Sequence, residues 1–285
     1  MNDRLTFTKM QGVGNDFVVI DAHKYTNIDW SAFAIEMCDR HLGIGADGLL
    51  ILESSRYADI QMRMYNPDGS PDVCGNGLRC VARYAFEHHL VETETMDIHT
   101  LAGVRRAIIS RDSHSEIAAV TVSMGQPIFE PARIPMRVTR DPALDFPLEL
   151  PDGTSITLSA LSTGSTHAVT FVPAMPSETE FQTISTMVEN HPLFPDRTSL
   201  MWCVPKGENR IQLRIWERGA GETWGCGTGA CAAAVAALLK GCVEQNRPVE
   251  VESIGGTLTV SWRPGDDIEM TGPAENVYEG VYCIN

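Results

Sequence analysis

Two short cysteine-glycine turns contain the residues of this sequence that are best suited to acid/base chemistry. Each turn has the pattern Cys-Gly-x-Gly, at Cys74–Gly77 and Cys226–Gly229, and each is followed by a run of apolar residues at helical spacing. The first N–H groups of a helix lack intrahelical partners and carry partial positive charge, so they can hold a carboxylate and favour thiolate over thiol. Glycine lets a ligand approach the backbone closely. The pattern predicts two acid/base sulfurs around one anion site.

The two turns belong to a longer internal duplication. Residues 60–80 and 211–231 agree at six positions, with one residue gained before the shared Cys-Gly. Segments that begin at Gly14 and Gly164 also match, and they lie 150 residues apart. We predict two halves, residues 1–121 and 122–274, with residues 275–285 returning to the first half. A single binding cleft between the halves is the geometry that such a duplication favours.

The elements that must position the turns can be predicted from periodicity. Apolar spacing indicates helices at 78–89, at 230–240 before Gly241, and at 30–42. Asn76 and Thr228 are good N-cap types, so we expect them to begin the first two helices. Short alternating segments predict strands at 16–22, 48–54, 60–66, 119–124, 168–173, 211–217 and 258–262.

The predicted fold class is therefore α+β. Each half is expected to be a mixed or antiparallel sheet wrapped around a central helix, with the active site between the halves. The Pro-rich stretch 126–151 is expected to be a surface excursion of the second half.

Composition excludes several classes of function. The net charge of −15 repels nucleic acid and anionic membranes, and no cluster of Lys or Arg offsets it. No apolar run approaches the roughly 20 residues that span a bilayer, and the first ten residues lack the apolar segment of a signal peptide. We expect a cytoplasmic protein with no nucleic-acid or membrane partner. A homodimer is one candidate assembly.

The chain has eight cysteines, and disulfide bonds are rare in a reducing compartment. The cysteines therefore suggest either metal binding or thiol chemistry. No Cys-x-x-Cys pair is present and no histidine stands at zinc-finger spacing, so we expect no metal site. The six cysteines outside the two turns are expected to be buried apolar residues.

Two opposed thiols are suited to removing a proton from one face of a carbon and returning one to the other face. The Cα–H of an amino acid is a very weak acid, so charges and hydrogen bonds placed in advance must stabilise the carbanion. One sulfur begins as thiolate and the other as thiol, and turnover exchanges their states. Such a pair titrates as a coupled unit.

The chain resembles the diaminopimelate epimerase family over essentially its whole length. The resemblance is carried by "KMQGVGNDFVVID", "CDRHLGIGADGLL", "YNPDGSPDVCGNGLRC", "FPDRTSLMW", "RIWERGAGETWGCGTGACAA" and "MTGPAENVYEG". It implies two pseudo-symmetric domains and a cofactor-independent enzyme that interconverts LL- and meso-diaminopimelate for lysine and cell-wall synthesis. The partner of the protein would be a small-molecule amino-acid substrate.

The resemblance also implies roles for individual residues. Cys74 and Cys226 would be the two bases, and Glu217 would take the ammonium groups of the substrate. With Glu217, His167 could tune the thiols. The α-carboxylate would be held by backbone and side-chain groups of Gly75, Asn76, Gly227 and Thr228. Further binding positions are Asn15, Asn66 and Arg218. Taken alone, Asn15 and Asn66 fit ordinary turn residues, and Glu217 and Arg218 fit solvated strand ends.

Two positions depart from the pattern of the family. Ser165 and Ser199 stand where the family usually has asparagines that contact the distal end of the substrate, and a hydroxyl is shorter than an amide. One alternative is therefore a related racemase of another amino acid, and a second is a catalytically silent, duplicated binding module. A pyridoxal-dependent racemase would need a Schiff-base lysine, but none of Lys9, Lys24, Lys206 and Lys240 lies in a glycine-rich phosphate-binding context.

Overall fold

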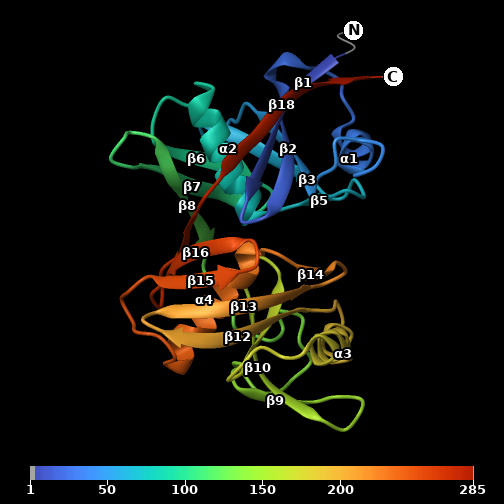
Figure 1. Ribbon diagram of the computed structural model, residues 1–285, viewed down its shortest axis with the longest axis vertical. Coiled ribbons are helices and arrows are strands. Elements are labelled where there is room, and N and C mark those ends of the chain that lie inside the picture. The colour runs from blue at the N-terminus through green and yellow to red at the C-terminus, as the bar shows by residue number, and fades with distance from the viewer. Residues whose placement is uncertain (1–3, 285) are drawn as a thin grey trace. The chain divides into compact units, whose positions relative to one another are not determined.

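A computed structural model describes residues 4–284, which form two compact units. Unit 1 runs to Ser123 and resumes at Thr271, whereas unit 2 runs from Met124 to Met270. Both boundaries between the units fall inside strands, in β8 and β17. Both ends of the described chain belong to unit 1 (Figure 1).

Unit 1 contains most of the first half of the chain and the C-terminal strand. Its elements are β1 (Arg4–Gly12), β2 (Asn15–Asp21), η1 (Ala22–Lys24), α1 (Trp30–Cys38), β3 (Gly48–Glu53), β4 (Ile60–Tyr65), β5 (Pro71–Asp72), α2 (Gly75–Glu87), β6 (Thr95–Thr100), β7 (Gly103–Arg111), the greater part of β8 (Ile117–Gly125) and β18 (Glu275–Cys283).

The sheet of unit 1 is mixed. Strand β1 pairs antiparallel with both β2 and β18, so the C-terminal strand completes this sheet. Strands β2 and β3 are parallel, as are β4 and β6, whereas β3–β4, β6–β7 and β7–β8 are antiparallel. Helix α2 packs against β1, β2, β3, β4 and β7, and α1 packs against β3 and β4.

Unit 2 repeats this order of elements. It contains β9 (Phe146–Glu149), β10 (Ser155–Ser162), β11 (Thr166–Phe171), α3 (Glu178–Glu189), β12 (Ser199–Gly207), β13 (Arg210–Glu217), β14 (Gly221–Thr223), α4 (Gly227–Lys240), β15 (Val249–Ser253), β16 (Gly256–Ser261) and the start of β17 (Ile268–Gly272).

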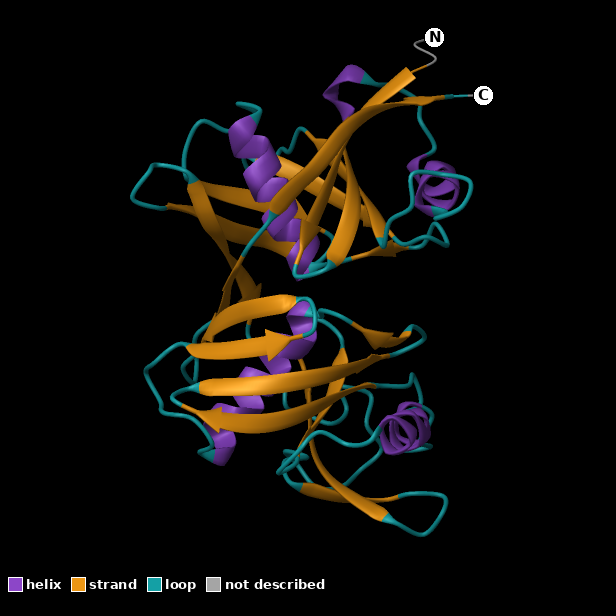
Figure 2. Ribbon diagram, in the orientation of Figure 1, coloured by secondary structure: helices purple, strands orange, loops and turns teal. Residues whose placement is uncertain are grey.

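The pairing in unit 2 also matches unit 1, element by element. Strands β11–β12 and β13–β15 are parallel, like β2–β3 and β4–β6, and β12–β13 and β15–β16 are antiparallel, like β3–β4 and β6–β7. In each unit a central helix, α2 or α4, contacts several strands of the sheet, and a second helix, α1 or α3, packs to one side of it (Figure 2). The duplication seen in the sequence is therefore a duplication of fold, and the predicted α+β class is confirmed.

The two central helices differ in their surroundings because their sequences differ. Helix α2 buries the face that includes Leu78, Val81 and Ala85, whereas α4 is built mainly of alanine and is buried on nearly all sides. Small side chains let strands approach α4 from several directions. Gly241, at φ 73°, ends α4 in the left-handed conformation, as its glycine predicted.

One helix of unit 2 was missed, and one expectation about this unit was wrong. Helix α3 was not predicted, although it occupies the position of α1 in the repeat. The stretch 126–151 is not only a surface excursion, because Ile134, Met136, Ala143 and Leu148 belong to a buried cluster with Phe181 of α3.

In unit 1, the helix predicted at 30–42 is shorter in the structure and ends at Cys38.

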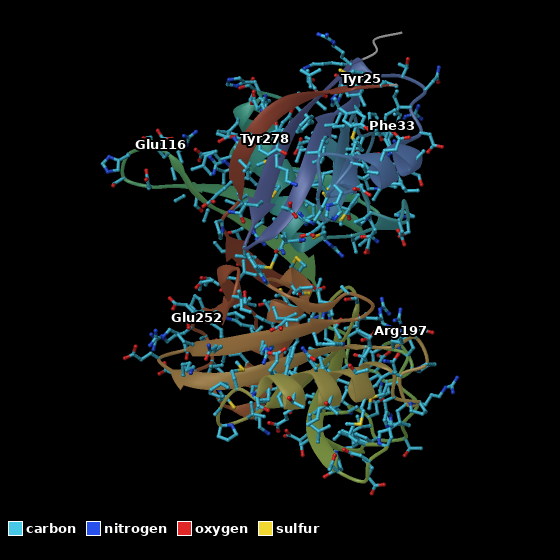
Figure 3. The ribbon with its side chains drawn as sticks, turned by 45° about the vertical axis from the view of Figure 1, so that its right-hand side comes forward. Tyr25, Phe33, Glu116, Arg197, Glu252 and Tyr278 are labelled. Carbon is cyan, nitrogen blue, oxygen red and sulfur yellow. The ribbon has the colours of Figure 1, made fainter. Side chains whose placement is uncertain are left out.

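Among the described residues, no helix is both long and apolar enough to cross a membrane. In unit 1, Tyr25 and Phe33 pack against Trp30 of α1, and both are labelled in Figure 3. Trp30 belongs to the buried core cluster of unit 1, and Tyr25 and Phe33 are partly buried against that cluster.

Candidate active site

Cys74 itself is the N-cap of α2. Its backbone is extended, at φ −144° and ψ 120°, and its sulfur accepts a hydrogen bond from the N–H of Gly77 at 3.4 Å. Asn76, which was expected to cap this helix, lies inside its first turn instead, because the sulfur takes the position of the capping oxygen. The N–H groups of Gly75 and Asn76 are left without an intrahelical acceptor by helix geometry.

Cys226 caps α4 in the same way. Its sulfur accepts from the N–H of Gly229 at 3.3 Å and lies 3.4 Å from the hydroxyl of Thr228. The expectation that Thr228 caps this helix was therefore also wrong, because the sulfur of Cys226 takes the position of the capping oxygen. Thr228 is held in turn by Thr163, whose hydroxyl donates to its carbonyl at 2.8 Å. The start of α4 thus presents the N–H groups of Gly227 and Thr228 beside a buried sulfur.

Neighbouring side chains leave little space for a Cβ at the third residue of each helix, where the chain has glycine. A Cβ on Gly229 would lie 2.6 Å from the sulfur of Met201 and 3.2 Å from that of Cys226, and one on Gly77 would lie 3.0 Å from Leu50. The glycines therefore allow the cysteine sulfurs to close onto the helix N-termini.

Two asparagines, Asn15 and Asn76, lie beside Cys74 in unit 1. The Cys74 thiol donates to Oδ1 of Asn15 at 3.5 Å, and Nδ2 of Asn76 donates to the same oxygen at 3.2 Å. Oδ1 of Asn76 is buried and has no hydrogen-bond partner among the described residues. Asn66 lies at the end of β4, where its Nδ2 donates to Asp72 at 3.2 Å and to Ser70.

Cys226 is held as a thiol. Burial, followed by the negative charge of Glu217, raises its pKa well above the ordinary value, and the hydrogen bonds from Thr228 and Gly229 do not offset this. Glu217 ends β13 and accepts from the hydroxyl of Thr223 at 2.5 Å. Cys226 can therefore act as a proton donor at neutral pH.

His167 is fully buried on β11, and burial lowers its pKa to about 4. Its Nδ1 donates to the carbonyl of Ser165 at 2.8 Å. The imidazole is therefore neutral at physiological pH, and its influence on the thiol of Cys226 cannot come from positive charge.

Ser199 pairs in register with His167, and its hydroxyl accepts from the backbone N–H of Arg218 at 3.0 Å. The Arg218 guanidinium is exposed and donates to the carbonyl of Asp196 at 3.0 Å. Unit 2 thus gathers Ser165, Ser199 and Arg218 near the end of β13. Ser199 supports the backbone of the arginine.

The sequence matches one family across most of its length. A model of the family described as diaminopimelate epimerase matches residues 7–130 and 159–277. The diaminopimelate epimerase of Pelotomaculum thermopropionicum is 42% identical over 279 residues, covering 97% of this chain and 98% of that one. That of Moorella thermoacetica is 43% identical over 282 residues, covering 98% and 99%. The chain belongs to the diaminopimelate epimerase family.

Solved structures of low sequence identity share the fold. A hydroxyproline epimerase from Agrobacterium vitis has a TM-score of 0.73 and 14% identity, and the match covers 98% of this chain and 92% of that chain. A phenazine biosynthesis protein of the PhzF family from Bacillus anthracis has a TM-score of 0.67 and 18% identity, with coverage of 98% and 99%. The fold of this chain is therefore also found in proteins that are not named diaminopimelate epimerase.

Four residues that sequence reasoning did not assign lie next to Asn15 in unit 1. Lys9, Asp16, Arg40 and Asp47 form a connected group of ion pairs, and Asp47 accepts from Nδ2 of Asn15 at 2.7 Å. All four lie inside two of the motifs that carried the family resemblance. The sequence signal that could have identified these residues was the presence of opposite charges in the two motifs.

In unit 2, the missed residue is Glu189, a buried carboxylate at the end of α3. It accepts from the indole N–H of Trp216 at 2.7 Å, from the N–H of Gly219 at 2.8 Å and from Arg197 at 3.0 Å. Arg197 lies at the surface of this unit, where Figure 3 labels it. Glu189 therefore ties down both sides of the segment that carries Glu217 and Arg218.

The other cysteines of this family member do not all follow expectation. All eight are free thiols. Cys38, Cys80, Cys203 and Cys231 are buried, and burial raises the pKa values of Cys38 and Cys80 to about 12. Cys242 is only partly buried and Cys283 is exposed, so the expectation of burial was wrong for these two. No cluster of His, Cys, Asp or Glu within residues 4–284 is arranged to hold a metal ion.

Proposed function

We propose that this chain is a diaminopimelate epimerase, an isomerase that interconverts LL- and meso-diaminopimelate in the synthesis of lysine and peptidoglycan precursors. Family membership over nearly the full chain supports the reaction, because the relatives that carry this name are about 40% identical to it. The observation that carries the mechanism is the pair of cysteine N-caps, Cys74 and Cys226, at corresponding positions of two repeated units.

In the proposed mechanism the substrate Cα lies between the two sulfurs. Cys226, held as a thiol by burial and by Glu217, donates a proton to one face while Cys74 removes one from the other. The roles reverse for the opposite epimer. Because the thiol pair exchanges one proton in each turnover, the two sulfurs need comparable proton affinities in the closed enzyme.

The helix N-termini stabilise the carbanion. Its charge delocalises onto the α-carboxylate, which receives the N–H groups of Gly75, Asn76, Gly227 and Thr228 together with the partial positive charge of both helices. The side chain of Asn76 has its Nδ2 committed to Asn15, so its buried oxygen suits an N–H of the substrate better than a carboxylate.

The remaining proposed contacts are made with the charged groups of the substrate and with its distal end. Glu217 takes an ammonium group, and Arg218 suits a carboxylate at the distal end through two parallel hydrogen bonds. Asn15 and Asn66 line the unit 1 side, and Ser165 and Ser199 stand on the unit 2 side with Arg218. Because serine is shorter than asparagine, a water molecule can complete the distal contact at these two positions.

The chemistry needs no prosthetic group, and the four lysines fit this proposal. The amine of Lys9 is paired with Asp16 at 2.6 Å, and Lys240 is paired with Asp145 at 2.5 Å. Lys24 and Lys206 are exposed. The absorption spectrum of the purified protein should therefore lack the visible band of a bound aldimine. We also propose a cytoplasmic location and leave open whether the chain forms a homodimer.

The test is proton exchange at Cα in deuterated solvent. Purified enzyme given LL-diaminopimelate should produce meso-diaminopimelate that carries deuterium at the inverted carbon, as read by NMR and mass spectrometry. Cys74→Ala and Cys226→Ala should each reduce inversion by about a thousandfold, since one of two acid/base groups is lost. Cys283→Ala is the matched control, because this exposed cysteine lies outside both helix N-termini, and it should keep full activity.

The same assay, run with a panel of amino acids, examines the alternative of a racemase with another substrate. The comparisons do not favour that alternative, since relatives that cover nearly the whole chain carry the name diaminopimelate epimerase. Exchange with another amino acid but not with diaminopimelate would contradict the proposed substrate. Unchanged inversion in both cysteine variants would contradict the mechanism.

A further inference from the structure

We propose that Asp47 is a positioning residue that sets the proton affinity of Cys74, because it fixes which end of the Asn15 amide faces the sulfur. The catalytic meaning of this inference rests on the proposed function. Its geometry lies entirely within unit 1.

Hydrogen-bond chemistry determines the orientation of Asn15. Oδ2 of Asp47 accepts from Nδ2 of Asn15 at 2.7 Å and from the backbone N–H of Asp16 at 3.1 Å. An ionised carboxylate can only accept, so the NH₂ end of Asn15 must face Asp47. The carbonyl end then faces Cys74, at 3.5 Å, and Asn76, at 3.2 Å. Turning the amide over would bring two oxygens together at Asp47.

Asp47 is itself held in place by charge. Its Oδ1 accepts from Arg40 at 2.7 Å, and Arg40 also pairs with both oxygens of Asp16. Although burial alone would raise the pKa of Asp16, the hydrogen bonds and charges of Arg40 and Lys9 outweigh burial and lower it to about 2. Lys9 is buried, pairs with Asp16 at 2.6 Å and donates to the carbonyl of Gly45.

The sheet places these residues side by side. Strand β2 begins at Asn15, and its parallel neighbour β3 pairs Gly48 with Phe17. Asp47 therefore stands immediately before β3 and next to the start of β2, where its backbone N–H donates to the carbonyl of Asp16 at 2.9 Å.

Two of the contacts of Cys74 act on its proton affinity in opposite directions. The N–H of Gly77 favours the thiolate, and the carbonyl oxygen of Asn15 favours the thiol by accepting its proton. A group that must both take and return a proton benefits from such a balance, since neither form is over-stabilised. If the amide were free to turn over, its NH₂ group would also favour the thiolate.

Other charges on the elements around Cys74 must be considered in any titration. They are Lys9 on β1, Asp16 on β2, Arg40 and Asp47 in the segment before β3, Asp72 on β5 and Arg79 on α2. Of these, only Asp47 is bonded to the side chain of Asn15 by the contacts described above.

The experiment measures the pH dependence of alkylation of Cys74 by iodoacetamide, resolved by peptide mass spectrometry in the full-length protein. In Asp47→Asn, one acceptor oxygen remains for the donors on Asn15, Asp16 and Arg40, so Asn15 is no longer held in one orientation. We expect the midpoint for Cys74 to fall by about half a pH unit. Asp47→Ala should lower it at least as far, and Asp47→Glu should restore it.

A double-mutant cycle separates positioning from simple loss of charge. Removing a nearby negative charge would also lower the pKa of a thiol, but that effect would persist when Asn15 is replaced. We expect Asp47→Asn to shift the midpoint of Cys74 in the wild type but not in the Asn15→Ala background. Asp72→Asn and Arg106→Ala serve as controls, and neither should match the shift of Asp47→Asn.

An unchanged midpoint in both Asp47→Asn and Asp47→Ala would overturn the proposal, as would an equal shift in the presence and absence of Asn15. The assay measures thiol reactivity and not turnover. A failure of the proposed epimerase activity, with the predicted shifts still observed, would therefore be distinguishable from a failure of this inference.

Discussion

At the scale of single residues, the proposed chemistry depends on two sulfur atoms that act as helix caps. Cys74 and Cys226 each accept the N–H of a glycine three residues later, at 3.4 and 3.3 Å. A capping sulfur is fixed relative to the N–H groups of the first turn, so any carboxylate bound there lies next to the acid/base group. In the proposed mechanism, substrate binding and proton transfer therefore take place at the same turn.

His167 gives a prediction about stability at this scale. Its pKa is about 4 in the folded protein, mainly because of burial, and about 6.5 in the unfolded chain. Between these values the unfolded state binds more protons, so stability is lost as pH falls from 7. Relative to His167→Gln, the wild type should lose about 2 kcal/mol more unfolding free energy between pH 7 and pH 5.

Urea unfolding followed by tryptophan fluorescence measures this difference, because four of the five tryptophans lie in unit 2. His114→Gln, in an exposed turn, is the control and should leave the pH dependence unchanged. Equal pH dependence in the wild type and His167→Gln would show that burial does not suppress protonation of this ring.

At the scale of elements, the packing of α4 against β12 decides what its first turn tolerates. Alanine normally stabilises a helix relative to glycine by roughly 0.5–1 kcal/mol. At Gly229, however, the added Cβ would meet the sulfur and Cε of Met201 at 2.6 and 2.8 Å. Met201 is fully buried, so its side chain has little free space. Gly229→Ala should therefore destabilise unit 2 by about 1–2 kcal/mol.

The cause can be isolated with a double-mutant cycle read by urea unfolding. In the Met201→Ala background the obstructing atoms are absent, so Gly229→Ala should be neutral or stabilising. A destabilisation of the same size in both backgrounds would show that Met201 is not the obstacle. Any accompanying loss of activity would report displacement of the Cys226 sulfur, which the new methyl group would approach to 3.2 Å.

At the scale of the whole molecule, one fold is used twice and each copy supplies one sulfur and one helix N-terminus. A reaction that inverts a carbon needs two groups on opposite faces, and duplication supplies two similar groups without a second fold. The chain of unit 1 is completed by β18, which pairs with β1, so unit 2 is inserted within unit 1. We propose that the two half-sites close on one substrate.

This proposal predicts a redox response. If Cys74 and Cys226 approach each other in the closed enzyme, a thiol oxidant such as diamide should take two electrons and two protons from the pair and leave a disulfide. Activity should disappear and then return with dithiothreitol, and peptide mass spectrometry should find the Cys74–Cys226 link. The experiment is done in Cys283→Ser to remove the exposed thiol. Full activity with both cysteines still open to alkylation would contradict the closed arrangement.

Much of the fold could be predicted from periodicity and from the repeat. The predicted strands at 48–54 and 211–217 correspond to β3 and β13, and the run 230–240 lies within α4. Helix α3 was missed because few of its residues are buried, among them Phe181 and Val188. A capping signal was present, since Ser177 is followed by Glu180 and its hydroxyl accepts the Glu180 N–H at 3.3 Å.

The sequence by itself determined the duplication, the two cysteine turns and the family, because these depend on residue types at fixed spacing along the chain. Only the tertiary structure showed that sulfur and not Asn76 or Thr228 caps each helix, since capping depends on backbone angles at one residue. It also decided the orientation of Asn15, whose partners lie 32 residues away at Asp47 and 59 away at Cys74. Contacts between such distant residues follow from strand register, which no local pattern specifies.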